Sequence, residues 1–249
     1  MKAMCTVVYL PSENGVCLAS LRDENPARPK ANKPAFVQNE NVPFLSPTDP
    51  EAGGTWIGVN ELGSVIVLLN GGFVNHEKRN LYRKSRGLIV AELLATEMPV
   101  IEWSMMDMEE IEHYTLVVFT EGNLFQLVWD GHQKHRIMLD NSKPHLWSSS
   151  TLYSEEAKAT RSMVFEKWLA TNPPFTKLSL LCFFRSINDG ENGFLINRNE
   201  AVKTLSYSFI EMQQDTVASF SYNDFNSGRH YKSKINILQK AINHCLIAS

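Results

Sequence analysis

Cys5 is the residue of this sequence best suited to do chemistry. It follows Met4 directly and opens the apolar run of residues 5–10. If Cys5 becomes the first residue of the chain, its own α-amine titrates near ~8 and can accept the thiol proton. The sequence therefore predicts a self-activating cysteine nucleophile. The competing interpretation is a small buried hydrophobe on a strand, which is a common role of cysteine.

Two charged residues, Arg22 and Asp23, are expected to lie beside Cys5. The apolar run that Cys5 opens is followed by a polar connector containing Asn14-Gly15 and then by a second apolar run, residues 16–21, a pattern typical of a hairpin. Antiparallel pairing around that turn brings Cys5 next to Arg22 and Asp23. There the guanidinium would favour the thiolate and the carboxylate could orient the amine. The alternative is a solvated charge cluster that ends a strand.

Asn70 is a candidate oxyanion donor. It ends a second predicted hairpin and precedes two glycines, so its alternative role is that of a turn residue. An Asn amide near a thiol can donate a hydrogen bond to a developing oxyanion. The glycines of residues 53–58 resemble a phosphate loop, but the segment lacks the Lys-Ser/Thr ending and precedes a strand. Close packing around Trp56 is the preferred interpretation there.

Composition and charge exclude several classes of protein. The 249 residues carry a net charge of −3 with Lys and Arg scattered, which is not the footprint of a nucleic-acid-binding protein. No segment has the ~20 apolar residues of a membrane span, and the first four residues lack a secretory h-region. His132 and His135 have no acidic or thiol partner at ligand spacing, so we expect neither a metal nor a cofactor. The four cysteines form no CxxC pair, which favours a reducing, cytoplasmic setting.

The order of the predicted elements indicates a single α+β domain over residues 1–249, because it lacks the regular alternation of a parallel sheet. Residues 22–53 hold six of the eleven prolines and are expected to form a long functional loop. Helices are predicted at 85–97, 155–171 and 176–184, with helical periodicity also at 235–247. Beyond the first hairpin, strands are predicted at 55–59, 64–69, 114–120, 124–129, 135–139, 194–197, 203–212 and 216–225.

Several motifs in order along the chain resemble the NRDE family, the family of the transport and Golgi organisation protein 2. They are Cys5 after Met4, Leu21-Arg-Asp-Glu-Asn25, Gly54-Thr-Trp-Ile-Gly58, the strand ending at Asn70, Trp147-Ser-Ser-Ser-Thr-Leu-Tyr153, Phe194-Leu-Ile-Asn-Arg198 and Lys203-Thr-Leu-Ser-Tyr207. The tetrad that names the family is present as residues 21–24, with Leu21 in the Asn position. The Arg and Asp of the tetrad are intact.

The resemblance implies a fold and a set of roles. The family is similar to the N-terminal-nucleophile hydrolases, which have a four-layer αββα sandwich. In their cysteine branch the first residue is the nucleophile. By that resemblance Cys5 is the nucleophile, Arg22 its thiolate partner, Asp23 the residue that orients the amine and Asn70 the oxyanion donor. Outer, substrate-binding candidates are Trp56, Ser149 and Arg198.

The predicted activity is hydrolysis of a non-peptide amide C–N bond in a small molecule such as an acyl amide. A second hypothesis is a carrier of haem or an acyl lipid on the same fold, since family members have been linked to such handling. A third is an interaction protein that uses the proline-rich segment. The hydrolase hypothesis requires removal of Met1–Met4, because otherwise the Cys5 amine is part of a peptide bond. It also predicts that Cys5 alkylates faster than Cys17 and Cys182, which are expected in the core, and than Cys245.

Overall fold

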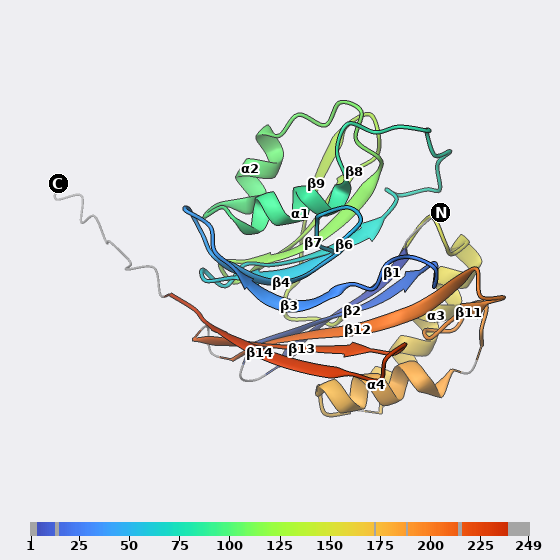
Figure 1. Cartoon of the computed structure of the whole chain (residues 1–249). Helices are drawn as coiled ribbons and strands as arrows, with labels where there is room; N and C mark the ends of the chain where they lie inside the picture. Colours follow the sequence, from blue (N-terminus) through green and yellow to red (C-terminus); the bar gives the residue numbers. More distant parts are fainter. Residues whose placement is uncertain (1–3, 13–14, 172, 188, 214–215, 239–249) are drawn as a thin grey trace.

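Two β-sheets stacked face to face, each covered by helices on its outer side, form a four-layer αββα sandwich (Figure 1). The fold expected from the sequence is therefore confirmed. The structure, a computed structural model, describes residues 4–12, 15–171, 173–187, 189–213 and 216–238, with only the backbone of Met4 and Cys5.

The first sheet carries both ends of the described chain. Its strands run in the order β10-β1-β2-β12-β13-β14, and β11 pairs with β12. Their bounds are β1 Met4–Ser12, β2 Gly15–Glu24, β10 His145–Ser148, β11 Asn197–Arg198, β12 Val202–Gln213, β13 Val217–Asp224 and β14 His230–Asn236. All pairings are antiparallel. In the strand order, β1 lies inside the sheet between β10 and β2.

The second sheet is a meander in sequence order, from β3 to β9. Its strands are β3 Asn32–Val37, β4 Phe44–Thr48, β5 Ile57–Asn60, β6 Val65–Asn70, β7 Tyr114–Thr120, β8 Asn123–Trp129 and β9 Lys134–Leu139. Apolar residues fill β6 and β7 without alternation, because these strands are buried on both faces.

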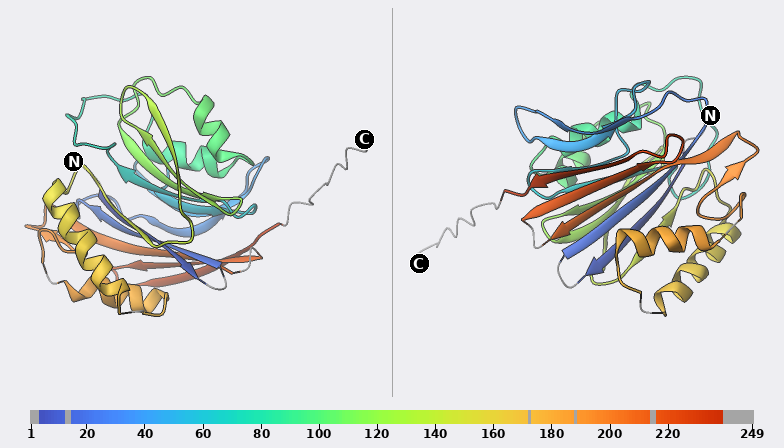
Figure 2. Two further views of the ribbon diagram at one scale, coloured as in Figure 1. Left: turned by 180° about the vertical axis from the view of Figure 1, so that it is seen from behind. Right: turned by 60° about the horizontal axis from the view of Figure 1, so that its bottom comes forward.

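Helices cover the two outer faces (Figure 2). The helices are α1 Arg86–Leu94, α2 Pro99–Met105, α3 Glu155–Leu169 and α4 Lys177–Ser186. The first two lie over the second sheet and the last two over the first. Ser154 caps α3 by accepting from the Ala157 amide, and Thr176 and Ser179 form a capping box on α4.

Strand alternation in the first sheet separates two cores. In β1, Val7 and Tyr9 face the second sheet, whereas Val8 and Leu10 pack with the helices. Between Thr204 and Ser206 of β12 a bulge shifts the pairing with β2. Beyond the bulge, the even-numbered residues of β12 face the second sheet.

Four expectations about elements need correction. Residues 22–53 are not one irregular loop, since they contain β3 and β4. The strand predicted at 194–197 is reduced to the two residues of β11, and a second helix, α2, begins at Pro99, where the sequence pattern was expected to end. The helix predicted at 235–247 begins inside β14, and its part from residue 239 lies outside the described residues.

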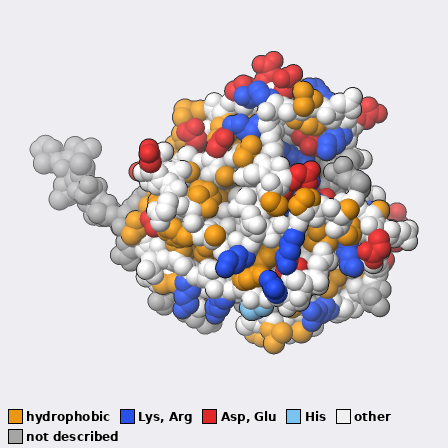
Figure 3. Space-filling model, viewed as in Figure 1, with side chains coloured by type: hydrophobic (Ala, Val, Ile, Leu, Met, Phe, Trp, Pro, Cys, Tyr) orange, Lys and Arg blue, Asp and Glu red, His pale blue; other side chains and the backbone are white. Residues whose placement is uncertain are grey.

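The surface seen in Figure 3 mixes hydrophobic, acidic and basic side chains. Basic side chains gather over the lower part of that face, where β14 exposes His230, Lys232 and Lys234. Within the described ranges, the chain forms no helix long and apolar enough to cross a bilayer.

Candidate active site

The hairpin of β1 and β2 brings together the first three predicted site residues. In its register Cys5 pairs with Arg22 and Met4 pairs with Asp23, as the sequence predicted. The side chain of Cys5 lies outside the described part of the structure. Arg22 shares its strand face with Leu18, which faces the second sheet, whereas Asp23 shares its face with Leu21, which packs toward the helices. The two neighbouring charges therefore lie in different layers.

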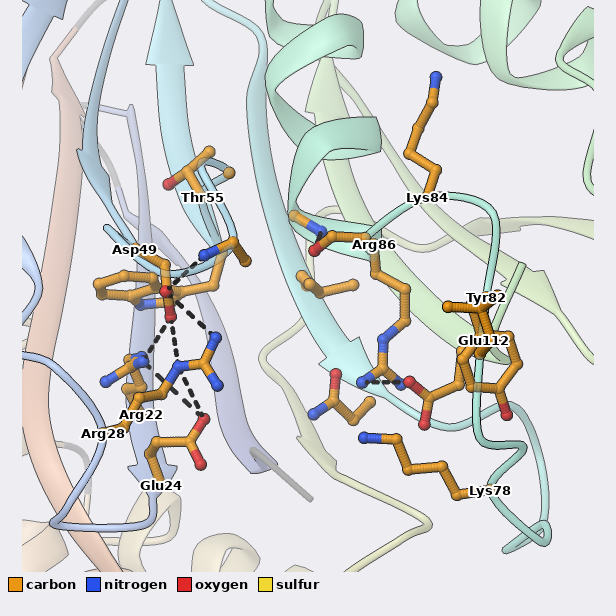
Figure 4. Close-up of a pocket in the computed structure, with 18 of the residues that line it drawn as sticks. Arg22, Glu24, Arg28, Asp49, Thr55, Lys78, Tyr82, Lys84, Arg86 and Glu112 are labelled. Atoms are coloured by element: carbon orange, nitrogen blue, oxygen red, sulfur yellow. Dashed lines mark hydrogen bonds and ion pairs between the residues drawn. The ribbon is translucent and has the colours of Figure 1, made fainter. Parts of the chain in front are cut away.

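A cavity of about 380 Å³ opens on the Arg22 side of β2 (Figure 4). The end of β2 and the segment around Asp49 form one wall, and Arg86, Glu112 and the 78–84 segment form the opposite one. Trp56 and Asn70 also line it, so three of the predicted site residues, counting Arg22, share one cavity. Eight of the described lining residues are charged: Arg22, Glu24, Arg28, Asp49, Lys78, Lys84, Arg86 and Glu112.

Arg22 is held in place by a carboxylate and by an aromatic ring. Its Nη2 donates to Asp49 Oδ2 at 2.8 Å, and its guanidinium carbon lies 4.8 Å from the centre of the Trp56 ring. The Arg22 residue is 5% exposed. Trp56 thus supports Arg22 from within the cavity wall, a more specific role than the close packing expected from the sequence.

Asp49 binds a second guanidinium. Arg28 donates to both of its oxygens, from Nε at 2.8 Å and from Nη2 at 3.1 Å. Burial raises the pKa of Asp49, but the hydrogen bonds and charges of the two arginines outweigh it and hold that pKa below its usual value. Arg22 therefore presents a fixed guanidinium at the register position of Cys5, and its charge is shared with the Asp49 carboxylate.

The opposite wall has its own ion pairs. Arg86 Nη2 lies 3.0 Å from Glu112 Oε2, and Arg86 Nη1 donates to the carbonyl of His113 at 3.0 Å. Lys84 pairs with Glu92 at 2.7 Å. These contacts fix the side chains of the wall across from Arg22.

Asn70 ends β6 at the junction of two cavities. It lines the first cavity and also a second one of about 240 Å³. Ser149 Oγ donates to the backbone carbonyl of Asn70 at 2.7 Å, and Ser149 is buried. Ser149, proposed as an outer candidate, lines only the second cavity of these two and positions the end of β6.

Asp23 is completely buried on the helix side of β2. Thr204 Oγ1 donates to its Oδ1 at 2.6 Å, while Oδ2 accepts no hydrogen bond from the described residues. Burial raises the pKa of Asp23 to about 7, although Thr204, Arg161 and Arg198 lower it. Asp23 pairs with Met4 in the hairpin, so its free oxygen belongs to the residue opposite the one that precedes Cys5.

Arg161 of α3 is a buried cation that lowers the pKa of Asp23, and no motif in the sequence indicates it. It donates to Ser148 Oγ at 2.8 Å and to Thr6 Oγ1 at 2.5 Å, so it ties the strand that begins beside Cys5 to the helix layer. The rings of Tyr153 and Phe194 lie 4.0 Å and 4.2 Å from its guanidinium carbon. Burial lowers the pKa of Arg161, and the nearby Asp23 carboxylate opposes that shift.

Arg198, the other outer candidate, lines neither of the two cavities. Its guanidinium donates to the carbonyl of Glu191 at 2.8 Å and 2.6 Å and to that of Leu152 at 3.3 Å. Its influence on the site is electrostatic, through the pKa of Asp23. Its predicted contact with substrate gains no geometric support.

Two cysteines are described with their side chains. Cys17 is buried as expected, and burial raises the pKa of its thiol to about 12. The expectation that Cys182 lies in the core is wrong, because Cys182 is exposed on α4. Cys245 lies outside the described residues. In the described part of the chain no three potential ligand side chains cluster as a metal site would require.

Together these residues could support attack by a thiolate on a carbonyl. An Asn amide lies in the same cavity as the guanidinium paired with the Cys5 position, and a buried carboxylate with a free oxygen lies on the other face of the strand. Asp49, Glu112 and Arg161 also shape the site, yet none belongs to a recognisable motif. A signal for Asp49 existed in its turn sequence between Pro47 and Pro50, where its Oδ1 accepts from the amides of Glu51 and Ala52.

The structure is similar to solved hydrolases. One is the Caenorhabditis elegans ortholog of N-acylethanolamine-hydrolysing acid amidase, with a TM-score of 0.56 and 10% identity, covering 83% of this chain and 92% of that chain. Two variants of the conjugated bile acid hydrolase of Clostridium perfringens have TM-scores of 0.51. They are 11% and 10% identical and cover 92% and 97% of this chain and 92% and 100% of theirs.

No curated protein matches the sequence significantly. The family described as Transport and Golgi organisation 2 matches residues 4–220, which is most of the chain. The likeness to the solved hydrolases establishes the fold, that of the N-terminal-nucleophile hydrolases. Because the family match covers residues 4–220, the chain belongs to the Transport and Golgi organisation 2 family.

Proposed function

We propose that this protein is an N-terminal cysteine hydrolase of non-peptide amide C–N bonds. The observation that carries the proposal is the register of β1 and β2, which pairs Cys5 with Arg22 at a cavity that Asn70 also lines. One structural relative named above is described as the ortholog of an amidase and the other as a conjugated bile acid hydrolase, and this supports a hydrolase here.

In the proposed reaction, the α-amine of Cys5 takes the proton of its thiol, and the thiolate attacks the amide carbonyl carbon. Asn70 donates a hydrogen bond to the oxyanion that forms. The ammonium returns its proton to the leaving nitrogen as the C–N bond breaks, which leaves a thioester on Cys5. The same amine then takes a proton from water, which attacks the thioester carbonyl; the C–S bond breaks, the acid is released, and the ammonium returns the proton to the Cys5 thiolate.

Asp23 would orient the amine in this scheme. Its Oδ2 is free to accept from an ammonium group at the start of β1. An ammonium at that position would stabilise the carboxylate and lower the pKa of Asp23 from about 7. Arg161 would hold the start of β1 through its hydrogen bond to Thr6.

The carrier hypothesis requires a wide apolar cleft. The cavity beside Arg22 has eight charged residues among the described lining and a volume of about 380 Å³. Binding of haem or an acyl lipid gains no support from that lining, since burying charged groups against apolar surface is costly. The hydrolase is therefore the better supported proposal.

Intact mass of the protein expressed from its natural start gives the first test. The expected mass is that of a chain beginning at Cys5. Iodoacetamide labelling, followed by peptide mass against pH, gives the second. At pH 7 we expect Cys5 to label about tenfold faster than the exposed Cys182, because a cationic environment lowers the thiol pKa. Cys17 should label slowest, since it is buried.

Variants at the two arginines bound to Asp49 make the second test specific. Arg22→Ala should move the Cys5 labelling midpoint to higher pH, and Arg22→Lys should largely retain the original midpoint. Arg28→Ala is the matched control, because Arg28 binds the same carboxylate but does not pair with Cys5. Circular dichroism verifies the fold of each variant. A mass that retains Met1–Met4, together with Cys5 labelling no faster than Cys182, would refute the hydrolase proposal.

A further inference from the structure

The cavity beside Arg22 has an excess of positive charge. Five of its described lining residues are cationic, namely Arg22, Arg28, Lys78, Lys84 and Arg86, and three are acidic, namely Glu24, Asp49 and Glu112. The lining thus has a formal charge of 5 − 3 = +2. The whole chain has a net charge of −3, so this excess is a local property of the cavity. A local field of this sign attracts anions.

Most of these cations already have a carboxylate partner. Asp49 serves both Arg22 and Arg28, Glu112 serves Arg86, and Lys84 binds Glu92 outside the lining. Lys78 differs, since it is exposed at the mouth of the cavity and forms no ion pair with any described residue. Figure 4 shows its side chain reaching into the space between the two walls. One unpartnered ammonium in a lining of this charge suits a single negative charge better than a dianion.

The amino-terminal end of α1 opens into the same cavity. Its cap residue Ser85 and the first-turn residues Arg86 and Gly87 are part of the lining, and the first turn contains no acidic residue. Ser85 already accepts from the amides of Gly87 and Leu88, so what the helix start adds is the positive end of its dipole, which favours anions. The start of α1 packs closely against the backbone of Gly54, where a Cβ would lie 2.2 Å from the carbonyl carbon of Gly87, so only glycine fits there.

Apolar side chains are a minority of the described lining residues. They are Ala52, Trp56, Leu68, Leu81 and the ring of Tyr82, and one face of the Trp56 ring is already covered by the Arg22 guanidinium. Ligand pockets for apolar molecules are lined predominantly by hydrophobic side chains. A long acyl chain would therefore face charged and polar groups on both walls.

We propose that the cavity binds a small amide bearing one carboxylate, with the carboxylate on Lys78 and the start of α1 and the amide toward Asn70. This inference rests on the proposed function and names the class of substrate. Lys78 is then the residue that determines specificity, and Arg86 forms a second, fixed part of the anion site because Glu112 holds it. Coulomb attraction at such an open cavity should weaken with added salt.

Binding measured by calorimetry on the full, correctly processed protein tests the proposal without requiring turnover. The probes are N-acetylglycine and N-acetyl-4-aminobutyrate, which differ in the spacing between amide and carboxylate, each compared with its neutral carboxamide. At least one acid should bind at least tenfold more tightly than its carboxamide. Lys78→Ala should remove this preference, whereas Lys78→Arg should retain it within about threefold. Lys143→Ala, an exposed lysine paired with Asp140, is the matched control and should change nothing.

Three results would overturn the inference. They are equal binding of acid and carboxamide, an unchanged preference in Lys78→Ala, and more than tenfold tighter binding of N-dodecanoylglycine than of N-acetylglycine. The rate of Cys5 labelling distinguishes a failure of the proposed substrate class from a failure of the hydrolase proposal. Fast labelling without acid preference contradicts only the substrate class. Acid preference in a protein with an unreactive Cys5 contradicts only the hydrolase.

Discussion

Arg22 and Asp23 are neighbours in the sequence, yet they lie in different environments. Arg22 faces the layer between the sheets, where Asp49 lies 2.8 Å away and a cavity reaches it. Asp23 faces the helix layer, is fully buried, and has one oxygen without a partner among the described residues. One charge is balanced at short range, and the other is opposed by burial.

The difference shows how a single strand can assign two roles to adjacent charges. Because successive side chains of a strand point to opposite faces, one residue step moves a charge from the cavity to the interior. At the cavity, the two nearby arginines favour the ionised form of the Asp49 carboxylate, and its pKa is therefore lowered. In the interior, the pKa of Asp23 rises to about 7, so its charge depends on pH. The following predictions test this contrast.

Removing the partner of Arg22 should have the largest effect. Asp49→Ala removes the 2.8 Å partner of buried Arg22 and leaves Glu24, 3.8 Å away, as its carboxylate among the described residues. Arg28 keeps Glu24 and Glu51. Breaking a buried pair by removing one partner typically costs about 3–5 kcal/mol. We expect a loss of that order in the free energy of unfolding, measured by urea denaturation at pH 7.

Glu51→Ala is the control for this change. Glu51 also pairs with Arg28, at 3.3 Å, but its side chain is 55% exposed. Exposed pairs contribute about 0–1 kcal/mol, so this variant should be nearly as stable as the native protein. Similar losses in both variants would mean that Asp49 is not a buried partner of Arg22.

Replacing the buried carboxylate should change how stability depends on pH. In the chain that retains Met1–Met4, which has no ammonium at Cys5, Asp23 keeps a proton between the unfolded pKa of ~3.9 and the folded pKa of about 7, whereas the unfolded chain has released it. Stability therefore falls as pH rises through this window, by up to about 1.4 kcal/mol per pH unit. Asp23→Asn should remove that slope and be more stable than the native protein at pH 8.

The measurement is a series of urea denaturations from pH 4 to pH 8 on both proteins. Asp224→Asn is a control of opposite sign, because hydrogen bonds and the charge of Lys30 outweigh burial and hold the pKa of Asp224 below its usual value. The Asp224 contribution should be lost as pH falls. A native slope that persists in Asp23→Asn would assign it to another group.

A smaller effect is expected from Thr204→Val, which keeps the shape of the side chain and removes the hydroxyl bound to Asp23. Hydrogen bonds to a charged group contribute about 1.5–3 kcal/mol and those to a neutral group about 1 kcal/mol. The destabilisation should therefore be greater at pH 8 than at pH 5. Thr120→Val removes a hydroxyl that pairs with the neutral Ser64, and its cost should not depend on pH.

The sequence was sufficient for the part of the site that local rules determine. The Asn14-Gly15 dipeptide in the sequence and the two apolar runs predict a hairpin, and the observed hairpin pairs Cys5 with Arg22. The strand that ends at Asn70 follows from the same type of pattern. These contacts are predictable because turn chemistry and period-two alternation determine the register.

The remaining contacts depend on packing between distant segments. Arg161 lies on a helix whose pattern of polar residues gives no sign that its guanidinium is enclosed by Tyr153 and Phe194. Asp49 lies in a proline-rich segment without periodicity, which concealed both its role and the two strands there. Cys182 was placed in the core because its neighbours are apolar, but α4 covers a sheet and keeps one exposed side, with Leu178 67% exposed.

The bulge in β12 lets one strand serve the environments of both Arg22 and Asp23 with two hydroxyl residues that are close in the sequence. Before the bulge Thr204 pairs with Asp23, and after it Ser206 pairs with Arg22, so Leu205 is the extra residue. In a regular strand residues 204 and 206 would share a face, but the extra residue puts Thr204 on the face of Asp23 and Ser206 on the face of Arg22. Deleting Leu205 would leave both pairings in a regular ladder, whereas replacing it would keep the bulge. The position therefore tolerates a shorter strand without loss of the hydroxyl donor of Asp23.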